Sequence, residues 1–241
     1  MKKNAIVTGA TRGIGQAIAM MLLEEGYHVI ATYAYDEESV EPCKTKFSSI
    51  SNDYEILWVD QTSKEELRAF AENMCKKGHI DCIVCNAGMT LRNKDLSEIT
   101  DDGWERVMMM NVNSNVYLIR DLFSVIPHGS RIIFTASLMG ILPHSMSLAY
   151  GVTKSAVIGL AKNLVKYFED TNTTVNAIAP GFVETEWQKK KPLEIRNNIV
   201  RKTAIKRFAD PKEIADAARF CLKNSFVNGA VIEVTGGYSY K

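Results

Sequence analysis

Three side chains in the stretch Gly129–Leu160 have the chemistry needed to move a proton to or from an oxygen atom. Tyr150 and Lys154 lie four residues apart, so on a helix they share one face, one turn apart. Ser137 follows a short β-branched and aromatic run that predicts a buried strand. A hydroxyl, a phenol and an ammonium that converge on one point would suit acid–base chemistry on a carbonyl. Since a Tyr-x-x-x-Lys pair is expected by chance in a chain with nine Tyr, this interpretation needs support from the whole chain.

Short apolar runs alternate with helical patterns along the whole chain. Strands are expected at 4–8, 27–32, 54–59, 80–85, 131–135, 173–179 and 230–234. Strands that alternate with helices at this spacing predict β-α-β units and a parallel sheet covered on both faces. The expected fold class is therefore α/β, a Rossmann-like doubly wound sheet of about seven strands. Because no linker or repeat interrupts the pattern, residues 1–241 are expected to form one domain.

The unusual residues of the chain come directly after the expected strands, at Gly9, Asp60, Asn86, Ser137 and Pro180. In open α/β sheets, ligands bind outside the carboxyl ends of the strands. Separate elements would therefore deliver these residues to one crevice.

A glycine-rich turn connects the first strand to the first helix, with the sequence Thr8-Gly9-Ala10-Thr11-Arg12-Gly13-Ile14-Gly15. Glycines allow a tight turn and a close approach of the backbone to phosphate. The start of the helix adds free N–H groups and a partial positive charge. The turn is therefore predicted to bind the pyrophosphate of a dinucleotide, although its spacing differs from Gly-x-Gly-x-x-Gly.

Taken together, the motifs resemble those of the short-chain dehydrogenase/reductase family over residues 4–237, nearly the whole chain. The resemblance is carried by Thr8-Gly-x-x-x-Gly-x-Gly15, Asn86-Ala87-Gly88, Asn111, Ser137, Tyr150-x-x-x-Lys154 and Pro180-Gly181, in that order. Within the family the chain looks most like 3-oxoacyl-carrier-protein reductases, notably at 8–15, 86–90 and 179–185. The resemblance implies an NAD(P)-dependent enzyme that transfers a hydride between nicotinamide and a carbonyl or secondary alcohol. It also implies a 3-oxoacyl thioester, as in fatty acid biosynthesis, as the first substrate to consider.

The resemblance assigns catalytic roles to four residues. Tyr150 would exchange a proton with the substrate oxygen, and Lys154 would favour the phenolate and bind the nicotinamide ribose. Ser137 would polarise the substrate oxygen, and Asn111 would hold a water that links the lysine to solvent. The implied cofactor-binding residues are Gly9, Thr11, Arg12, Gly13, Ile14, Gly15, Tyr33, Asp60, Asn86, Ala87, Gly88, Tyr150, Lys154, Pro180, Gly181, Val183 and Thr185. No metal ligand is expected.

Two positions favour NADP(H) over NAD(H). Tyr33 stands where NAD-dependent members of the family usually carry an Asp that binds the adenosine ribose. Arg12 suits a 2′-phosphate, because guanidinium binds phosphate well. Asp36 and Glu37 argue the other way, since a carboxylate would repel that phosphate; we expect both to be solvated charges at the start of the next helix.

The family places a mobile substrate lid at about 182–208. This segment has eight basic and three acidic residues, and eight minus three gives +5, whereas the whole chain carries +1. One hypothesis is that the lid receives an anionic group, such as the phosphopantetheine of a carrier protein or coenzyme A; the alternative is a solvated helical lid. An apolar pocket would instead suit a steroid, a sugar or another secondary alcohol, and its candidates are Met89, Leu138, Met139, Leu142, His144 and Trp187.

A dinucleotide-binding regulator without turnover is the alternative from another class, and it is disfavoured because all four catalytic residues are present. Epimerases and dehydratases of the family usually have longer chains. The resemblance also implies a homotetramer, formed through the helices at about 101–122 and 148–168 and the last strand.

Net charge indicates which partners to expect, and the cysteine content indicates the cellular compartment. A charge of +1 gives no reason to expect nucleic acid or a membrane surface as a partner. Five cysteines, with no targeting segment, fit a reducing cytoplasmic location. Cys82-x-x-Cys85 lies within an expected strand, so these thiols should point to opposite faces as separate buried residues.

Overall fold

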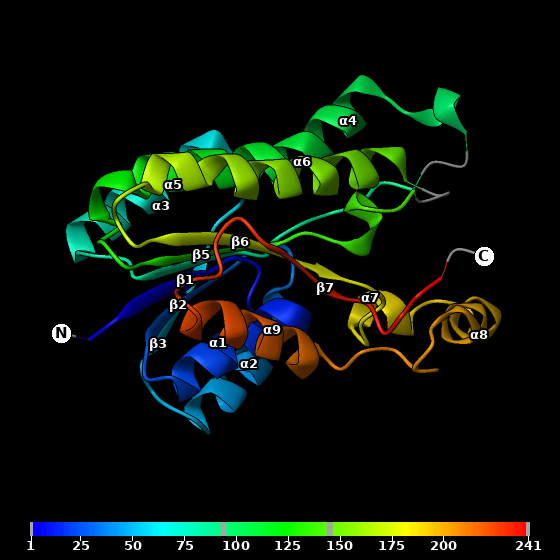
Figure 1. Ribbon diagram of the computed structural model, residues 1–241, viewed down its shortest axis with the longest axis horizontal. Coiled ribbons are helices and arrows are strands. Elements are labelled where there is room, and N and C mark those ends of the chain that lie inside the picture. Colours follow the sequence, from blue (N-terminus) through cyan, green and yellow to red (C-terminus); the bar gives the residue numbers. More distant parts are fainter. Residues whose placement is uncertain (1, 93–94, 144–146, 240–241) are drawn as a thin grey trace.

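We describe the protein as a computed structural model, which covers residues 2–92, 95–143 and 147–239 (Figure 1). Its described residues form one parallel sheet with the strands β1 (Asn4–Val7), β2 (His28–Tyr33), β3 (Tyr54–Trp58), β4 (Cys82–Cys85), β5 (Arg131–Thr135), β6 (Thr174–Pro180) and β7 (Val231–Val234). The strand order is β3-β2-β1-β4-β5-β6-β7. The expected α/β class and the seven-stranded parallel sheet are confirmed.

Helices cover both faces of this sheet (Figure 1). One face carries α1 (Gly13–Glu24), α2 (Val40–Ser48) and α9 (Pro211–Lys223). The other face carries α3 (Lys64–Lys77), α4 (Asp101–Met108), α5 (Ser114–Leu122) and α6 (Leu148–Leu164). Two short helices, α7 (Glu186–Lys189) and α8 (Leu193–Lys202), lie at one end of the molecule. No helix in the described part of the chain is long and apolar enough to cross a membrane.

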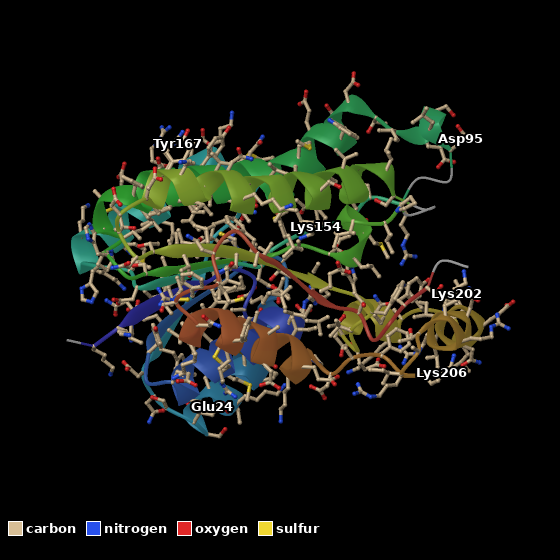
Figure 2. All side chains as sticks on the ribbon, viewed as in Figure 1. Glu24, Asp95, Lys154, Tyr167, Lys202 and Lys206 are labelled. Carbon is tan, nitrogen blue, oxygen red and sulfur yellow. The ribbon has the colours of Figure 1, made fainter. Side chains whose placement is uncertain are left out.

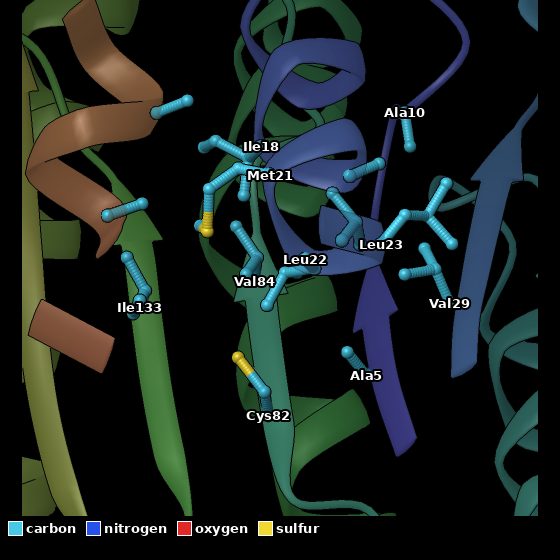
Figure 3. Packing of buried hydrophobic residues seen from close by; sticks show 14 of the residues in the cluster. Ala5, Ala10, Ile18, Met21, Leu22, Leu23, Val29, Cys82, Val84 and Ile133 are labelled. Carbon is cyan, nitrogen blue, oxygen red and sulfur yellow. The ribbon is translucent and has the colours of Figure 1, made fainter. Parts of the chain in front are cut away.

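Successive strand residues point into two separate hydrophobic clusters, as the alternation of a strand requires. Ala5 of β1 faces the cluster formed with Ile18 and Leu22 of α1 (Figure 3). Its neighbour Ile6 faces the opposite cluster, formed with α3, α5 and α6. Each fully buried Leu or Ile in these clusters contributes about 1.5–3 kcal/mol. The predicted separation of the two thiols in β4 is confirmed, since Cys82 belongs to the first cluster and Cys85 to the second.

The order of the strands reverses at β1. β1 pairs with β2 on one side and with β4 on the other. The connections that leave β1 and β4 therefore run to opposite faces of the sheet, and such a switch point leaves a crevice at the carboxyl ends of the strands.

The helical stretch at 101–122 is not one continuous α-helix. Residues Met109–Asn113 between α4 and α5 form a π-helical turn. Such turns widen the backbone by one residue and are frequent at functional sites. The sequence pattern did not reveal this turn, because the apolar spacing continues through it.

Candidate active site

A cleft of about 730 Å³ lies at the carboxyl ends of the strands. Of the predicted cofactor residues, those that line it are Gly9, Arg12, Gly13, Ile14, Asn86, Ala87, Gly88, Tyr150, Lys154, Pro180, Gly181, Val183 and Thr185. Ser137 lines the same cleft. The structure therefore brings together residues that follow four different strands, as their positions in the sequence predicted.

The hydroxyl, phenol and ammonium singled out in the sequence lie together. Ser137 follows β5, and α6 carries Tyr150 and Lys154 one turn apart. The side chain of Ser147 caps the start of α6 by accepting a hydrogen bond from the backbone N–H of Tyr150. Lys154 is only 4% exposed, and its Nζ donates to the carbonyl oxygen of Thr135 at 2.6 Å. Figure 2 shows Lys154 between α6 and the sheet, inside the molecule.

Burial controls the ionisation of the phenol and the ammonium. It raises the pKa of Tyr150 above its ordinary value, and a hydrogen bond with Ser137 only partly opposes this shift. Burial lowers the pKa of Lys154 to about 8. Removal of the phenol from water therefore outweighs the hydrogen bond from Ser137. The role that the resemblance implied for Lys154, to favour the phenolate, stays a prediction.

Asn111 fastens the loop after β4 to the helix that carries Tyr150. Its Oδ1 accepts a hydrogen bond from the N–H of Met89 at 2.8 Å, and its Nδ2 donates to the carbonyl of Met89 at 2.9 Å. The same Nδ2 donates to the hydroxyl of Thr153, which in turn donates to the carbonyl of Tyr150. Asn111 is only 1% exposed and does not line the cleft. Its role in a water relay stays a prediction.

The glycine-rich turn forms a cradle that side chains would fill. Gly9 and Gly13 have φ angles of 62° and 58°, in the left-handed region that favours glycine. Asn86 donates through its Nδ2 to the carbonyls of Thr8 and Gly9, both at 3.0 Å. The first turn of α1 has no side-chain cap, so its N–H groups are available to an anion. These features fit the pyrophosphate of a dinucleotide.

The close approach of Gly15 to this turn gives a stability prediction. A Cβ at Gly15 would lie 2.2 Å from the carbonyl oxygen of Gly9 and 2.5 Å from Nδ2 of Asn86. Gly15→Ala is therefore expected to lower the free energy of unfolding by about 3 kcal/mol, through overpacking. Gly159→Ala is the control, because a Cβ there meets nothing within 4 Å and helical Ala is favoured over Gly. Urea unfolding followed by circular dichroism would measure both, and equal midpoints would contradict the prediction.

Asp36 occupies the end of the cleft that follows β2. It is 8% exposed, its carboxylate accepts a hydrogen bond from the hydroxyl of Thr11, and its Oδ2 lies 3.4 Å from Nε of Arg12. The expectation of a solvated charge is therefore wrong for Asp36, because these two partners compensate its burial. Glu37, by contrast, is exposed as expected.

Tyr33 and Asp60 are near this end but do not line the cleft. Instead Tyr35 lines it, and its hydroxyl donates to Asp60 at 2.5 Å. Burial would raise the pKa of the Asp60 carboxyl, but hydrogen bonds from Tyr35 and Thr62 outweigh burial and hold that pKa below its ordinary value. The Asp60 carboxylate is therefore charged and holds the hydroxyl of Tyr35 by a hydrogen bond.

The segment at 182–208 contains α7 and α8, and its first half lines one side of the cleft. The ring of Trp187 packs edge-on against Tyr150, with ring centroids 6.2 Å apart. Arg196 binds Glu184 through both of its terminal nitrogens, at 3.1 and 2.6 Å. Of the predicted apolar pocket, Met139 and Trp187 line the cleft, whereas Leu138 is buried in the interior. Met89 and Leu142 are not lining residues, and His144 lies outside the described residues.

Several lining residues have no role assigned from the sequence. They are Ala34, Tyr35, Arg92, Met110, Thr135, Ala136 and Ser147. Ala34 and Tyr35 directly follow β2, so the rule about strand ends would have found them. Arg92 lies in a segment with no local pattern that points to the cleft.

Comparison with known proteins finds relatives that match nearly the whole chain. A family model described as enoyl-(acyl carrier protein) reductase matches residues 9–239. The 3beta-hydroxysteroid dehydrogenase 2 of Eggerthella lenta is 30% identical over 98% of this chain and 95% of its own. A 3-oxoacyl-[acyl-carrier-protein] reductase of Staphylococcus aureus is 29% identical over 98% of both chains.

Solved structures with a similar fold also match nearly the whole chain. A short-chain dehydrogenase/reductase from Serratia marcescens has a TM-score of 0.91 at 27% identity and covers 98% of both chains. A blue fluorescent protein from a metagenomic library, in complex with NADPH, has a TM-score of 0.90 at 25% identity over 98% of both chains. The chain belongs to the short-chain dehydrogenase/reductase family, a family of NAD(P)-dependent oxidoreductases. Within it, the chain is similar both to 3-oxoacyl-[acyl-carrier-protein] reductases and to a hydroxysteroid dehydrogenase.

Proposed function

We propose that the protein is an NADP(H)-dependent reductase of a carbonyl compound, with a 3-oxoacyl thioester as the first candidate substrate. The observation that carries the proposal is that Ser137, Tyr150 and Lys154 line one cleft together with the glycine-rich turn. When bound, the dinucleotide supplies or accepts the hydride. The glycine-rich turn would hold its pyrophosphate, and Asn86, Gly88 and Thr185 would lie beside its other parts.

The protein's own residues would donate a proton to the substrate oxygen and stabilise the charge that remains. Because the pKa of Tyr150 is raised, its phenol carries a proton at neutral pH and can donate that proton to the substrate oxygen. Ser137 would donate a hydrogen bond to the same oxygen as negative charge develops there. The ammonium of Lys154 lies 5.6 Å from the centroid of the Tyr150 ring and would stabilise the phenolate that remains. Trp187, which packs edge-on against Tyr150, would help to hold the phenol ring in place.

The proposed preference for NADP(H) rests on Arg12 and on similar structures that contain NADPH. Asp36 works against this preference, since its carboxylate lies beside the same guanidinium. We therefore propose a preference for NADPH that is modest in size.

Two groups of relatives suggest different substrates for this protein. One is named for 3-oxoacyl-carrier-protein reduction and the other for hydroxysteroid dehydrogenation. A screen of NADPH oxidation across 3-oxoacyl thioesters, ketosteroids and small ketones would test the proposal. The highest kcat/KM is expected for a thioester; a higher value for a ketosteroid would assign the alternative. Binding of NADPH without oxidation of any of these would support a regulator instead.

The lowered pKa of Lys154 gives a pH prediction for the reduction. Below a pH of about 8 the side chain is an ammonium, and above that pH it loses its charge. A neutral amine cannot stabilise the phenolate left on Tyr150, so kcat/KM for reduction is expected to be level below pH 8 and to fall above it. Lys154→Arg is the control, because a guanidinium keeps its charge. Any residual activity of that variant should not fall near this pH; an identical fall in both proteins would contradict the assignment.

A further inference from the structure

Most basic residues of the lid are either paired with a carboxylate or remote from the cleft. Lys189 pairs with Glu186 at 2.7 Å, and Arg196 pairs with Glu184 at 2.6 Å. Arg207 is likewise paired, with Glu213, at 2.6 Å. Figure 2 shows Lys202 and Lys206 at the end of the molecule that carries α8, away from Lys154. These five basic residues are therefore either paired with a carboxylate or remote from the cleft.

Lys191 is neither paired with a carboxylate nor remote from the cleft. It lines the cleft, and so does Arg92. Neither side chain forms an ion pair with another described residue. The Nζ of Lys191 lies 5.3 Å from the centroid of the Phe182 ring, which also lines the cleft. Burial and the nearby charges of Arg92 and Arg196 lower the pKa of Lys191. Two like charges that converge without a counter-charge cost free energy unless an anion binds between them.

Arg92 and Lys191 lie in two chain segments that both contact the helix or the ring of the proposed proton donor, Tyr150. Arg92 follows Leu91, whose carbonyl accepts a hydrogen bond from Ser147 at 2.5 Å, and Ser147 caps the helix of Tyr150. Lys191 lies four residues after Trp187, whose ring packs on Tyr150. The acidic residues that line the cleft are Asp36 and Glu186. Asp36 is engaged by Thr11 and Arg12, and Glu186 by Lys189, so neither neutralises this pair.

Lys190 also lines the cleft. A hydrogen bond from Lys189, with smaller contributions from the charges of Lys190 and Arg12, lowers the pKa of the Glu186 carboxyl.

We propose that Arg92 and Lys191 form an anion subsite for the substrate itself, so that the substrate carries a carboxylate or phosphate as well as the reacting carbonyl. This inference rests on the proposed function, because it takes Tyr150 as the residue at the reacting oxygen. The carbonyl end would meet Ser137 and Tyr150, while the anionic end would meet Arg92 and Lys191. The guanidinium offers a planar pair of donors and the ammonium a point charge, and both suit carboxylate and phosphate oxygens.

The test compares substrates that carry an anionic group with close analogues that lack it. A 4-oxo acid is compared with its methyl ester, and a 3-oxoacyl thioester of 4′-phosphopantetheine with that of pantetheine. The wild-type protein is expected to favour the anionic member of at least one pair by about 10–100-fold in kcat/KM, the range of a charge-assisted contact. The pair that shows this preference distinguishes a carboxylate from a phosphate.

The double variant Arg92→Met/Lys191→Met is expected to abolish this preference through a higher KM for the anionic member of the pair. Arg201→Met is the matched control, because it removes a charge from α8 at a position that does not line the cleft. Equal use of charged and neutral substrates by the wild-type protein would overturn the subsite alone, as would a preference that survives in the double variant. Turnover of neither member, with NADPH still bound, would instead overturn the proposed function.

Discussion

Tyr150→Phe is expected to lower kcat for NADPH-dependent reduction by about 10²–10⁴-fold, the range of general acid catalysis. The change removes the only atom that can pass a proton to the substrate oxygen from this position. The ring remains, so its edge-on contact with Trp187 and its position beside Lys154 should be preserved. Cofactor affinity should therefore be unchanged. Single-turnover kinetics at saturating NADPH would measure the rate, and quenching of Trp fluorescence would measure the binding.

Tyr167→Phe is the matched control for this experiment. Tyr167 follows the same helix but is 71% exposed and lies away from the cleft (Figure 2). Loss of the hydroxyl there should leave both kcat and NADPH affinity unchanged. If Tyr150→Phe kept full turnover, the assignment of Tyr150 as proton donor would be wrong. If the wild-type protein bound NADPH but reduced none of the substrates, a regulator would be the better description.

The sheet and its catalytic edge could be predicted because their patterns are local. Each strand is a short apolar run, and a turn or helix follows it within a few residues, so the end of each strand is visible in the sequence. Tyr150 and Lys154 are one helical turn apart, and this periodicity alone places them on one face. Ser137 joins them because parallel strands end at the same edge of a sheet.

The rest of the site depends on contacts between distant parts of the chain. Asn111 donates to Thr153, 42 residues away, and Thr11 donates to Asp36, 25 residues away. No local pattern specifies such partners, so a buried Asp36 could not be distinguished from a solvated helix start. The pKa values of Tyr150 and Lys154 depend on burial by several elements at once, which is why their directions required the structure. The same applies to Arg92, whose place in the cleft is fixed by how the loop after β4 packs against α6.

The arrangement around Asp36 makes cofactor choice sensitive to a single charge. A 2′-phosphate bound at Arg12 would approach the carboxylate that now lies 3.4 Å from Nε of that arginine. Two like charges about 4 Å apart repel by about 4 kcal/mol at an intermediate effective dielectric, and less where solvent screens them. The same carboxylate could accept hydrogen bonds from the ribose hydroxyls of NAD(H). Asp36 should therefore oppose NADPH and assist NADH.

Asp36→Asn is expected to raise the ratio of kcat/KM for NADPH to that for NADH by about 10–100-fold, which is smaller than the unscreened interaction implies. The amide oxygen of Asn can still accept the hydrogen bond from Thr11, so the local fold should persist. Steady-state kinetics with both cofactors at low and high salt would measure the ratio, which should change less at high salt.

Glu38→Gln separates a specific role of Asp36 from a general effect of charge. Glu38 also faces Arg12, at 3.8 Å, but its side chain is 74% exposed, so water and salt screen it far more. Its replacement should change the cofactor ratio little, although it removes the same unit of charge. Equal changes in the two variants would mean that net charge, rather than the buried carboxylate, sets the preference. A fall in the ratio for Asp36→Asn would show that Asp36 instead holds Arg12 in place for the 2′-phosphate.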